Sequence, residues 1–267
     1  MRVIMIGAHP DDSEYYAGGT VAMWAEAGVQ VQIVAVTNGD AGHQSEGGGA
    51  LARRRAAESR KSARILGVSW RTLDIRDGGV VPSVECREAV IRAIREWKAD
   101  LVISHRPNDY HPDHRYTGQL MQDAAYLVSV PNICPDTPRL EHNPVFLFFL
   151  DEFKKPLHFR PDVAVDVTRG MDKKWRSMDA MDSQMYEWIP WMDERLKEVP
   201  RGKAERLEWL KNYLAPTFTR WTDMIRGALA ERYGDIRAGQ VEYAEAFELC
   251  EYGRQPSREE LWELFPK

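Results

Sequence analysis

Two short clusters of histidine and aspartate are the residues of this sequence that could do chemistry. The first reads His9-Pro10-Asp11-Asp12, and the second reads His111-Pro112-Asp113-His114. Imidazole nitrogens mixed with carboxylate oxygens suit zinc better than calcium or magnesium, which prefer cages of oxygen. Since about 100 residues separate the clusters, a shared site needs a fold that brings the two stretches together.

A catalytic zinc site has three protein ligands and an open position for water. His9, Asp12 and one histidine of the second cluster supply that number of ligands. Asp11 then stays free to take a proton from the bound water, whose pKa zinc lowers to about 7. The sequence therefore predicts a metal-dependent hydrolase with one Zn²⁺ per chain. For either cluster alone, helix capping is an alternative, because Asp11, Asp12 and Asp113 stand where helices are expected to begin.

Both clusters follow short apolar segments that are typical of buried strands. Residues 2–7 precede the first cluster, and residues 100–104 precede the second. Binding sites of open α/β sheets lie beyond the carboxyl ends of strands, so the clusters stand where a site is expected. His105 also ends the second of these strands, where we expect it to make a structural hydrogen bond.

The rest of the first half alternates between strand-like and helix-like segments. Strands are expected there at 29–36 and 70–73, and helices at 17–28, 50–66, 82–97 and 113–127; in the second half, strands are expected at 145–150 and 163–167. Short connections between alternating strands and helices indicate a parallel sheet that is covered on both faces. The predicted fold is therefore α/β and Rossmann-like, with a mostly parallel twisted sheet and helices on both faces.

The second half is less regular, but it shows no linker between domains. Helices are expected over 169–188 and over 203–232, the latter interrupted near Pro216, and a short surface helix is expected after Gly253. We therefore expect a single domain. It comprises residues 1–267, with a core of about 2–168 and an extra C-terminal helical and strand segment of about 169–267.

The composition limits the kinds of partner. The formal net charge is -5, from 36 basic and 41 acidic side chains, so no clustered positive field for nucleic acid is expected. No stretch approaches the roughly 20 apolar residues that span a bilayer, and the apolar start of the chain is too short for a signal peptide. Cys86, Cys134 and Cys250 are too far apart to indicate a disulfide framework. We expect a soluble cytoplasmic protein.

Several segments resemble the signatures of a known family, the LmbE-like (PIG-L) zinc N-deacetylases. Residues 8–14, with Gly-Gly-Thr at 18–20, are similar to the first signature of that family, and residues 111–115 are similar to the second. Residues 37–40, Arg55 with Glu58, and residues 243–247 are similar to further segments of the family. The resemblance runs from residue 2 to about residue 248, and it implies the LmbE-like version of the Rossmann-like fold.

The resemblance implies which residues bind the metal. His9, Asp12 and His114 match the zinc ligands, and Asp11 matches the general base. It also implies the reaction, which is hydrolysis of the amide of an N-acetylated amino sugar with release of acetate, by a homo-oligomeric enzyme. Two alternatives stay open: a metal-dependent amidase acting on a thiol or sugar conjugate, and a non-catalytic sugar-binding module on the same fold.

Further residues are expected to act on the substrate. His111 matches a second catalytic histidine of the family, which polarises the carbonyl or protonates the leaving amine. Asp113 matches the carboxylate that orients this histidine, and Arg55 matches an arginine that contacts substrate. Independently of the resemblance, Tyr110 precedes the second cluster and can donate a hydrogen bond to an oxyanion.

The sequence departs from the family pattern in two places. Met181 stands where many relatives carry a histidine, and a methionine cannot donate a hydrogen bond to substrate. The stretch from residue 188 to residue 232 is expanded and rich in tryptophan, with Trp188, Trp191, Trp209 and Trp221. Aromatic faces can stack on sugar rings, and the alternative is that they pack between helices or subunits.

Overall fold

Five parallel strands form the centre of the computed structural model, which describes residues 1–267 except for the side chain of Ala204. These strands are β1 (Arg2–Gly7), β2 (Gln30–Thr37), β3 (Ser69–Ile75), β4 (Leu101–Ser104) and β5 (Val145–Phe149). Side chains alternate between the two faces, so Val3 and Met5 of β1 enter one core while Ile4 and Ile6 enter the other. Because both faces are covered, the central strands are continuously apolar.

Two antiparallel strands from the second half of the chain complete the sheet. β7 (Ala244–Gly253) lies between β5 and β6 (Val163–Asp166), and the strand order is β3-β2-β1-β4-β5-β7-β6. The predicted α/β fold with a mostly parallel sheet is confirmed. β7 also places a late segment of the chain inside the sheet rather than at its edge, so the C-terminal part is built into the same layer as the first half.

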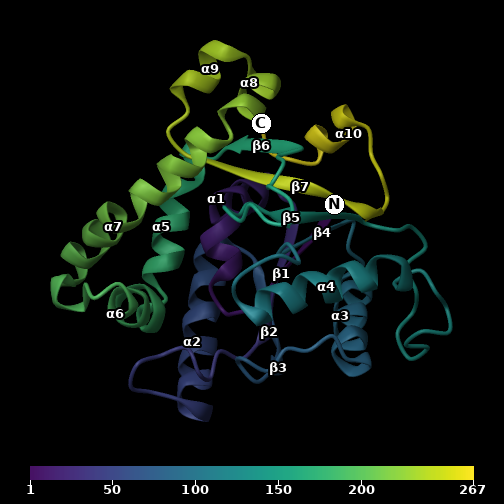
Figure 1. Ribbon diagram of the computed structural model, residues 1–267, viewed down its shortest axis with the longest axis horizontal. Coiled ribbons are helices and arrows are strands. Elements are labelled where there is room, and N and C mark those ends of the chain that lie inside the picture. Colours follow the sequence, from purple (N-terminus) through teal and green to yellow (C-terminus); the bar gives the residue numbers. More distant parts are fainter.

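Helices cover both faces of the sheet (Figure 1). On one face lie α1 (Asp12–Glu26), α2 (Gly48–Leu66), α5 (Met171–Asp179) and α7 (Lys203–Met224), and on the other lie α3 (Val84–Trp97) and α4 (Pro112–Leu127). The remaining helices are the short η1 (Thr168–Gly170), η3 (Leu196–Glu198), α6 (Ile189–Met192), α8 (Arg226–Tyr233), α9 (Asp235–Gln240) and α10 (Arg258–Glu263), with the π-helix η2 (Ser183–Trp188). No helix among the described residues has the length and apolarity needed to cross a membrane.

The buried carboxylate of Glu245 connects the first helix, α5 and the last strand. Glu245 of β7 accepts hydrogen bonds from the backbone amides of Gly19 and Thr20, at 2.9 and 2.7 Å. Lys174 of α5 donates to the same carboxylate at 2.8 Å, and both side chains are only 2% exposed. A Cβ atom at Gly19 would lie 2.7 Å from Cβ of Val167. The glycine therefore allows α1 to approach the segment after β6 closely, where a side chain would collide.

The expected interruption near Pro216 is wrong. α7 continues through Pro216 and ends only at Met224, and Ile225 separates it from α8. One face of α7 is buried against the core by Leu210, Leu214 and Phe218. This packing on both sides of the proline holds the helix together, although Pro216 lacks the amide that would complete the hydrogen-bond ladder.

Candidate metal centre

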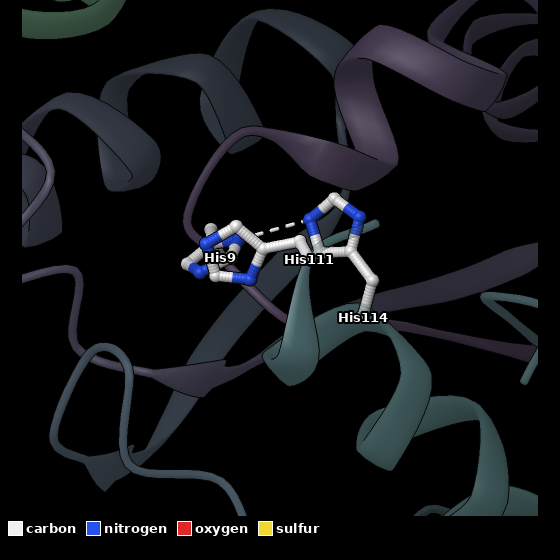
Figure 2. A group of neighbouring side chains, drawn as sticks. All are labelled: His9, His111 and His114. Carbon is white, nitrogen blue, oxygen red and sulfur yellow. Dashed lines mark hydrogen bonds between the residues drawn. The ribbon is translucent and has the colours of Figure 1, made fainter. Parts of the chain in front are cut away.

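The two histidine clusters lie beyond the carboxyl ends of neighbouring parallel strands. β1 ends at Gly7 just before the first cluster, and β4, which pairs with β1, ends at Ser104 before the loop that leads to the second. The chain passes from β1 to β2 and β3 on one side, and then returns to β4 on the other. A crevice forms where the strand order reverses in this way. The fold therefore brings His9, His111 and His114 together, as Figure 2 shows.

Three side chains present donor atoms at the spacing of a tetrahedral metal site. Nδ1 of His9 lies 3.1 Å from Nε2 of His114, which in turn lies 3.5 Å from Oδ1 of Asp12. Nδ1 of His9 is also 3.6 Å from Oδ2 of Asp12. Ligands at about 2.0–2.1 Å from a tetrahedral ion are separated by about 3.3 Å. The donor set of two imidazoles and one carboxylate therefore fits a divalent metal ion.

A second layer of polar residues orients these candidate ligands. Nε2 of His9 lies 3.2 Å from Oδ1 of Asp77, and Nδ1 of His114 lies 3.0 Å from Oδ2 of Asp109. Nε2 of His105 lies 3.0 Å from Oδ2 of Asp12. Carboxylate partners on the far nitrogen of a histidine are typical of metal sites, since they fix the ring and raise its basicity. His105 contacts the site as well as the backbone amide of Ala8, 3.1 Å from its Nε2.

Asp77 and Asp109 are functional candidates that the sequence analysis missed. Asp77 follows β3, and Asp109 stands two residues before His111. Both lie beyond carboxyl ends of strands of the same sheet, and this position is the signal that could have found them. A lone aspartate in a loop is common, however, because aspartate also favours turns.

Neighbouring residues of opposite charge shift the pKa values of the candidate ligands. Burial opposes ionisation of Asp12, but His114 and His105 outweigh it and hold the pKa of its carboxyl well below the usual range. Burial also lowers the pKa of His9, but hydrogen bonds with Asp113, Asp12 and Asp77 reverse the effect and raise this pKa well above its usual value. The pocket is therefore built to hold positive charge at His9, which a metal ion can supply in place of a proton.

Asp11 is held apart from the three candidate ligands. Its Oδ2 lies 3.2 Å from a guanidinium nitrogen of Arg55, which is 2% exposed. Burial raises the pKa of Asp11, and Arg55 opposes that rise. Arg55 also donates to the backbone carbonyls of Gly39 and Pro10, at 3.3 and 3.4 Å. The structure therefore places Arg55 as the partner of Asp11, at the edge of the cavity where the sequence analysis expected a substrate contact.

His111 is the N-cap residue of α4, and its ring nitrogen Nδ1 accepts a hydrogen bond from the backbone amide of Asp113 at 3.2 Å. Burial, with His9 and His114 nearby, lowers the pKa of His111. A neutral imidazole that accepts at Nδ1 carries its proton on Nε2. His111 is therefore set up as a hydrogen-bond donor.

Asp113 lies elsewhere than the sequence analysis expected. Its carboxylate accepts from the amides of Gly78 and Val80, at 2.7 and 3.1 Å, and lies 3.3 Å from Nε2 of His9. The carboxylate thus supports His9, and the backbone amide of Asp113, rather than its side chain, makes the hydrogen bond to His111. Tyr110 lies at the rim, where the residue is 71% exposed and its ring is edge-on to that of His111.

The candidate metal centre opens into a cavity of about 540 Å³ with two different sides. We call the first the polar floor, and it comprises His9, Asp11, Asp12, Asp77, His111 and His114. We call the second the apolar wall, and it comprises Tyr15, Met185, Trp188, Ile189 and Met192. The wall comes mainly from η2 and α6, which follow α5 in the chain.

The tryptophan-rich segment divides between packing and the cavity. Trp188 lines the cavity, and its ring stacks on that of Trp191 with centroids 5.2 Å apart. Trp221 is buried and stacks on Tyr16, so it belongs to the core. Met181 is also buried in the core, and Gln184 of η2, whose backbone amide donates to the carbonyl of Met181, lines the cavity.

Comparison with known proteins connects this site to deacetylases. Residues 4–125 match the family model described as PIG-L, GlcNAc-PI de-N-acetylase. The diacetylchitobiose deacetylase of Thermococcus kodakarensis is 29% identical over 199 residues, which cover 71% of this chain and 73% of that protein. The solved structure of the N,N'-diacetylchitobiose deacetylase from Pyrococcus horikoshii matches with a TM-score of 0.72 and 25% identity, over 93% of this chain and 83% of that one.

One similar protein has a different chemistry. The 4-oxalmesaconate hydratase of Pseudomonas putida is 25% identical over 193 residues, which cover 69% of this chain and 74% of that protein. Similarity of this degree therefore includes both deacetylases and a hydratase. Residues 4–125, which carry both histidine clusters, match the family model, so this part of the chain is similar to the PIG-L (LmbE-like) family.

Proposed function

We propose that this chain is a zinc-dependent N-deacetylase, which hydrolyses the amide of an N-acetylated amino sugar and releases acetate. The observation that carries the proposal is the convergence of His9, Asp12 and His114 at metal-ligand spacing, with Asp11 beside them but turned toward Arg55. The deacetylase relatives support the reaction and the substrate class. We further propose that the chain forms a homo-oligomer in the cytoplasm.

The candidate metal ligands of the floor, together with Asp11 and its partner Arg55, have separate parts in the proposed reaction. A zinc ion bound by His9, Asp12 and His114 would polarise the amide carbonyl and lower the pKa of water. Asp11, whose pKa is raised by burial, accepts the proton of the attacking water. Arg55 keeps the Asp11 carboxylate in place while it carries its charge.

The hydrogen-bonding of His111 favours one of the two roles that the sequence left open. Because Nδ1 accepts from the Asp113 amide, only Nε2 has a proton to offer. A neutral imidazole that gave up this proton would become an imidazolate, which is unfavourable. We therefore propose that His111 donates a hydrogen bond to the developing oxyanion, and that Asp11 returns its proton to the leaving amine.

The hydratase relative makes addition of water to a carboxylated acid a second candidate function. The charges of the cavity favour the amide. Of the residues that line the cavity, Arg55 is the one lysine or arginine, and it is already paired with Asp11. A substrate with several carboxylates needs cationic partners when it leaves water. A neutral N-acetylated sugar needs none.

Asp11 provides the test. Asp11→Asn should retain the metal and lower kcat for acetate release from N-acetylglucosamine or N,N'-diacetylchitobiose by about 10²–10⁴-fold, because a base and not a ligand is removed. Elemental analysis and an acetate assay measure the two quantities. Asp235→Asn, exposed on α9, is the matched control. Normal acetate release by Asp11→Asn would refute the role as base, and loss of metal would refute its position outside the ligand set.

A further inference from the structure

We propose that the apolar wall, centred on Trp188, binds a neutral sugar ring attached to the ring that carries the N-acyl group. This inference rests on the proposed deacetylase function and specifies its substrate. The cavity of about 540 Å³ is lined by residues of η2 and α6 as well as by the floor. A second ring would fill the part of the cavity beside η2 and α6.

The wall offers apolar surface without a free charge. Met185, Trp188, Ile189 and Met192 line it. Glu187, the acidic residue of η2, is bound on its other side by His43 at 2.8 Å and by the guanidinium of Arg54. A carboxylated or phosphorylated group would therefore meet no cation at the wall, whereas the carbon-bearing face of a sugar ring fits an aromatic surface.

The wall is held rigidly by residues that do not line it. Ser183 donates its backbone amide to Glu58 at 3.0 Å, and Tyr186 donates its hydroxyl to Asp179 at 2.6 Å. Together with the partners of Glu187, these contacts fix η2 from the side away from the cavity. Single π-helical turns are frequent at functional sites, and this one leaves Met185 and Trp188 toward the cavity.

Trp188 is also supported from one side. Trp191 stacks on it with an angle of 18° between the rings. Trp191 and Met192 are 47% and 51% exposed, so the apolar surface continues from the cavity to the outside of the molecule. A substrate longer than one sugar can therefore extend along this surface from the floor outward. Trp188 is the specificity-determining residue in this arrangement, and Glu187 is a positioning residue that holds η2.

The proposal is tested by comparing a substrate of two rings with a substrate of one. For Trp188→Ala, kcat/KM for N,N'-diacetylchitobiose should fall about tenfold through a higher KM, and the loss for N-acetylglucosamine should be smaller. Trp188→Phe should restore most of the preference for two rings. Trp262→Ala, which removes a tryptophan of α10 that does not line the cavity, is the matched control. Equal losses on both substrates would overturn the proposal.

Binding separates failure of this inference from failure of the proposed reaction. Calorimetric titration of the metal-loaded protein with N,N'-diacetylchitobiose should show binding that weakens about tenfold in Trp188→Ala, whether or not acetate is released. If the wild type binds this disaccharide but releases no acetate, the deacetylase proposal fails and the wall proposal stands. If Trp188→Ala binds it as tightly as the wild type, or if a disaccharide with a carboxylated second ring binds more tightly, the wall proposal fails.

Discussion

The polar floor and the apolar wall of the same cavity are built in opposite ways. On the floor, His9 and His114 are each backed by a carboxylate, and these charges face one another within a few ångströms. On the wall, the one charge of η2, Glu187, is paired with the guanidinium of Arg54 and hydrogen-bonded to His43, neither of which lines the cavity. Charges converge where a reaction needs them and are turned away where a neutral group is to be bound. The comparison indicates that the floor determines the chemistry and the wall determines the choice of substrate.

The largest expected effect comes from breaking the floor. His114→Ala removes a candidate ligand, so metal content should fall and acetate release from every substrate should drop on the order of 10³-fold or more. Trp188→Ala should leave the metal content unchanged. Metal analysis of both variants, beside His158→Ala on the surface as a control, measures the difference. Full metal content in His114→Ala would contradict the assignment of this ligand.

A smaller effect concerns an acid buried behind the floor. Glu14 of α1 accepts from Ser62 at 2.9 Å through Oε1, and Oε2 has no partner among the described residues. Burial raises the pKa of Glu14 to about 7. The unfolded chain loses this proton near its ordinary pKa of about 4.3, whereas the folded protein keeps it up to about pH 7. The contribution of this acid to the stability of the fold is therefore fully present below pH 4.3 and is lost as the pH rises through 7.

In the wild type, Glu14 should therefore lower the free energy of unfolding by roughly 3 kcal/mol between about pH 4 and pH 8. In Glu14→Gln this decrease should be absent. Urea titrations of the metal-free protein at both pH values measure this change. Glu208→Gln, exposed on α7, is the control and should keep the pH dependence of the wild type. An unaltered pH dependence in Glu14→Gln would show that this carboxyl is not the source.

The smallest expected effect sharpens the comparison within the floor. Oδ2 of Asp109 lies 3.0 Å from Nδ1 of His114. Asp109→Asn removes this charge but leaves the three candidate ligands in place. Loss of such an outer partner typically lowers metal affinity 10–100-fold. Competition with a chelator measures the affinity, with Asp172→Asn, exposed on α5, as the control. An affinity within twofold of the wild type would mean that Asp109 does not tune the site.

The fold and the floor were more predictable than the wall. β1 and β4 are mostly apolar, and the His-Pro-Asp clusters come directly after β1 and one short loop after β4, so position in the sheet could be inferred from local sequence. Trp188 and Trp221 look alike in the sequence, yet one lines the cavity and the other is packed on Tyr16. Their fates depend on the π-helical turn and on the register of α7, which are set by tertiary packing rather than by local pattern.

The region around Pro216 also could not be predicted from local sequence. Local chemistry predicts a break there, because proline lacks an amide, and the buried face of α7 overrides that preference. The contact of the Asp113 carboxylate with His9 was likewise not evident, since it depends on the loop of Gly78 and Val80 meeting α4. Such contacts join segments far apart in the chain, and no single stretch of sequence encodes them.

The position of β7 has a consequence for how the protein is made. β6 joins the sheet by pairing with β7. The amides of Gly19 and Thr20 lie on α1, directly after the first histidine cluster, and they donate to Glu245 of β7. During synthesis, the first half can form its parallel strands, but the amides of Gly19 and Thr20 gain this acceptor only after residue 245 has left the ribosome. A nascent chain that stopped at residue 168 would carry every candidate ligand without the strand that locks them in place.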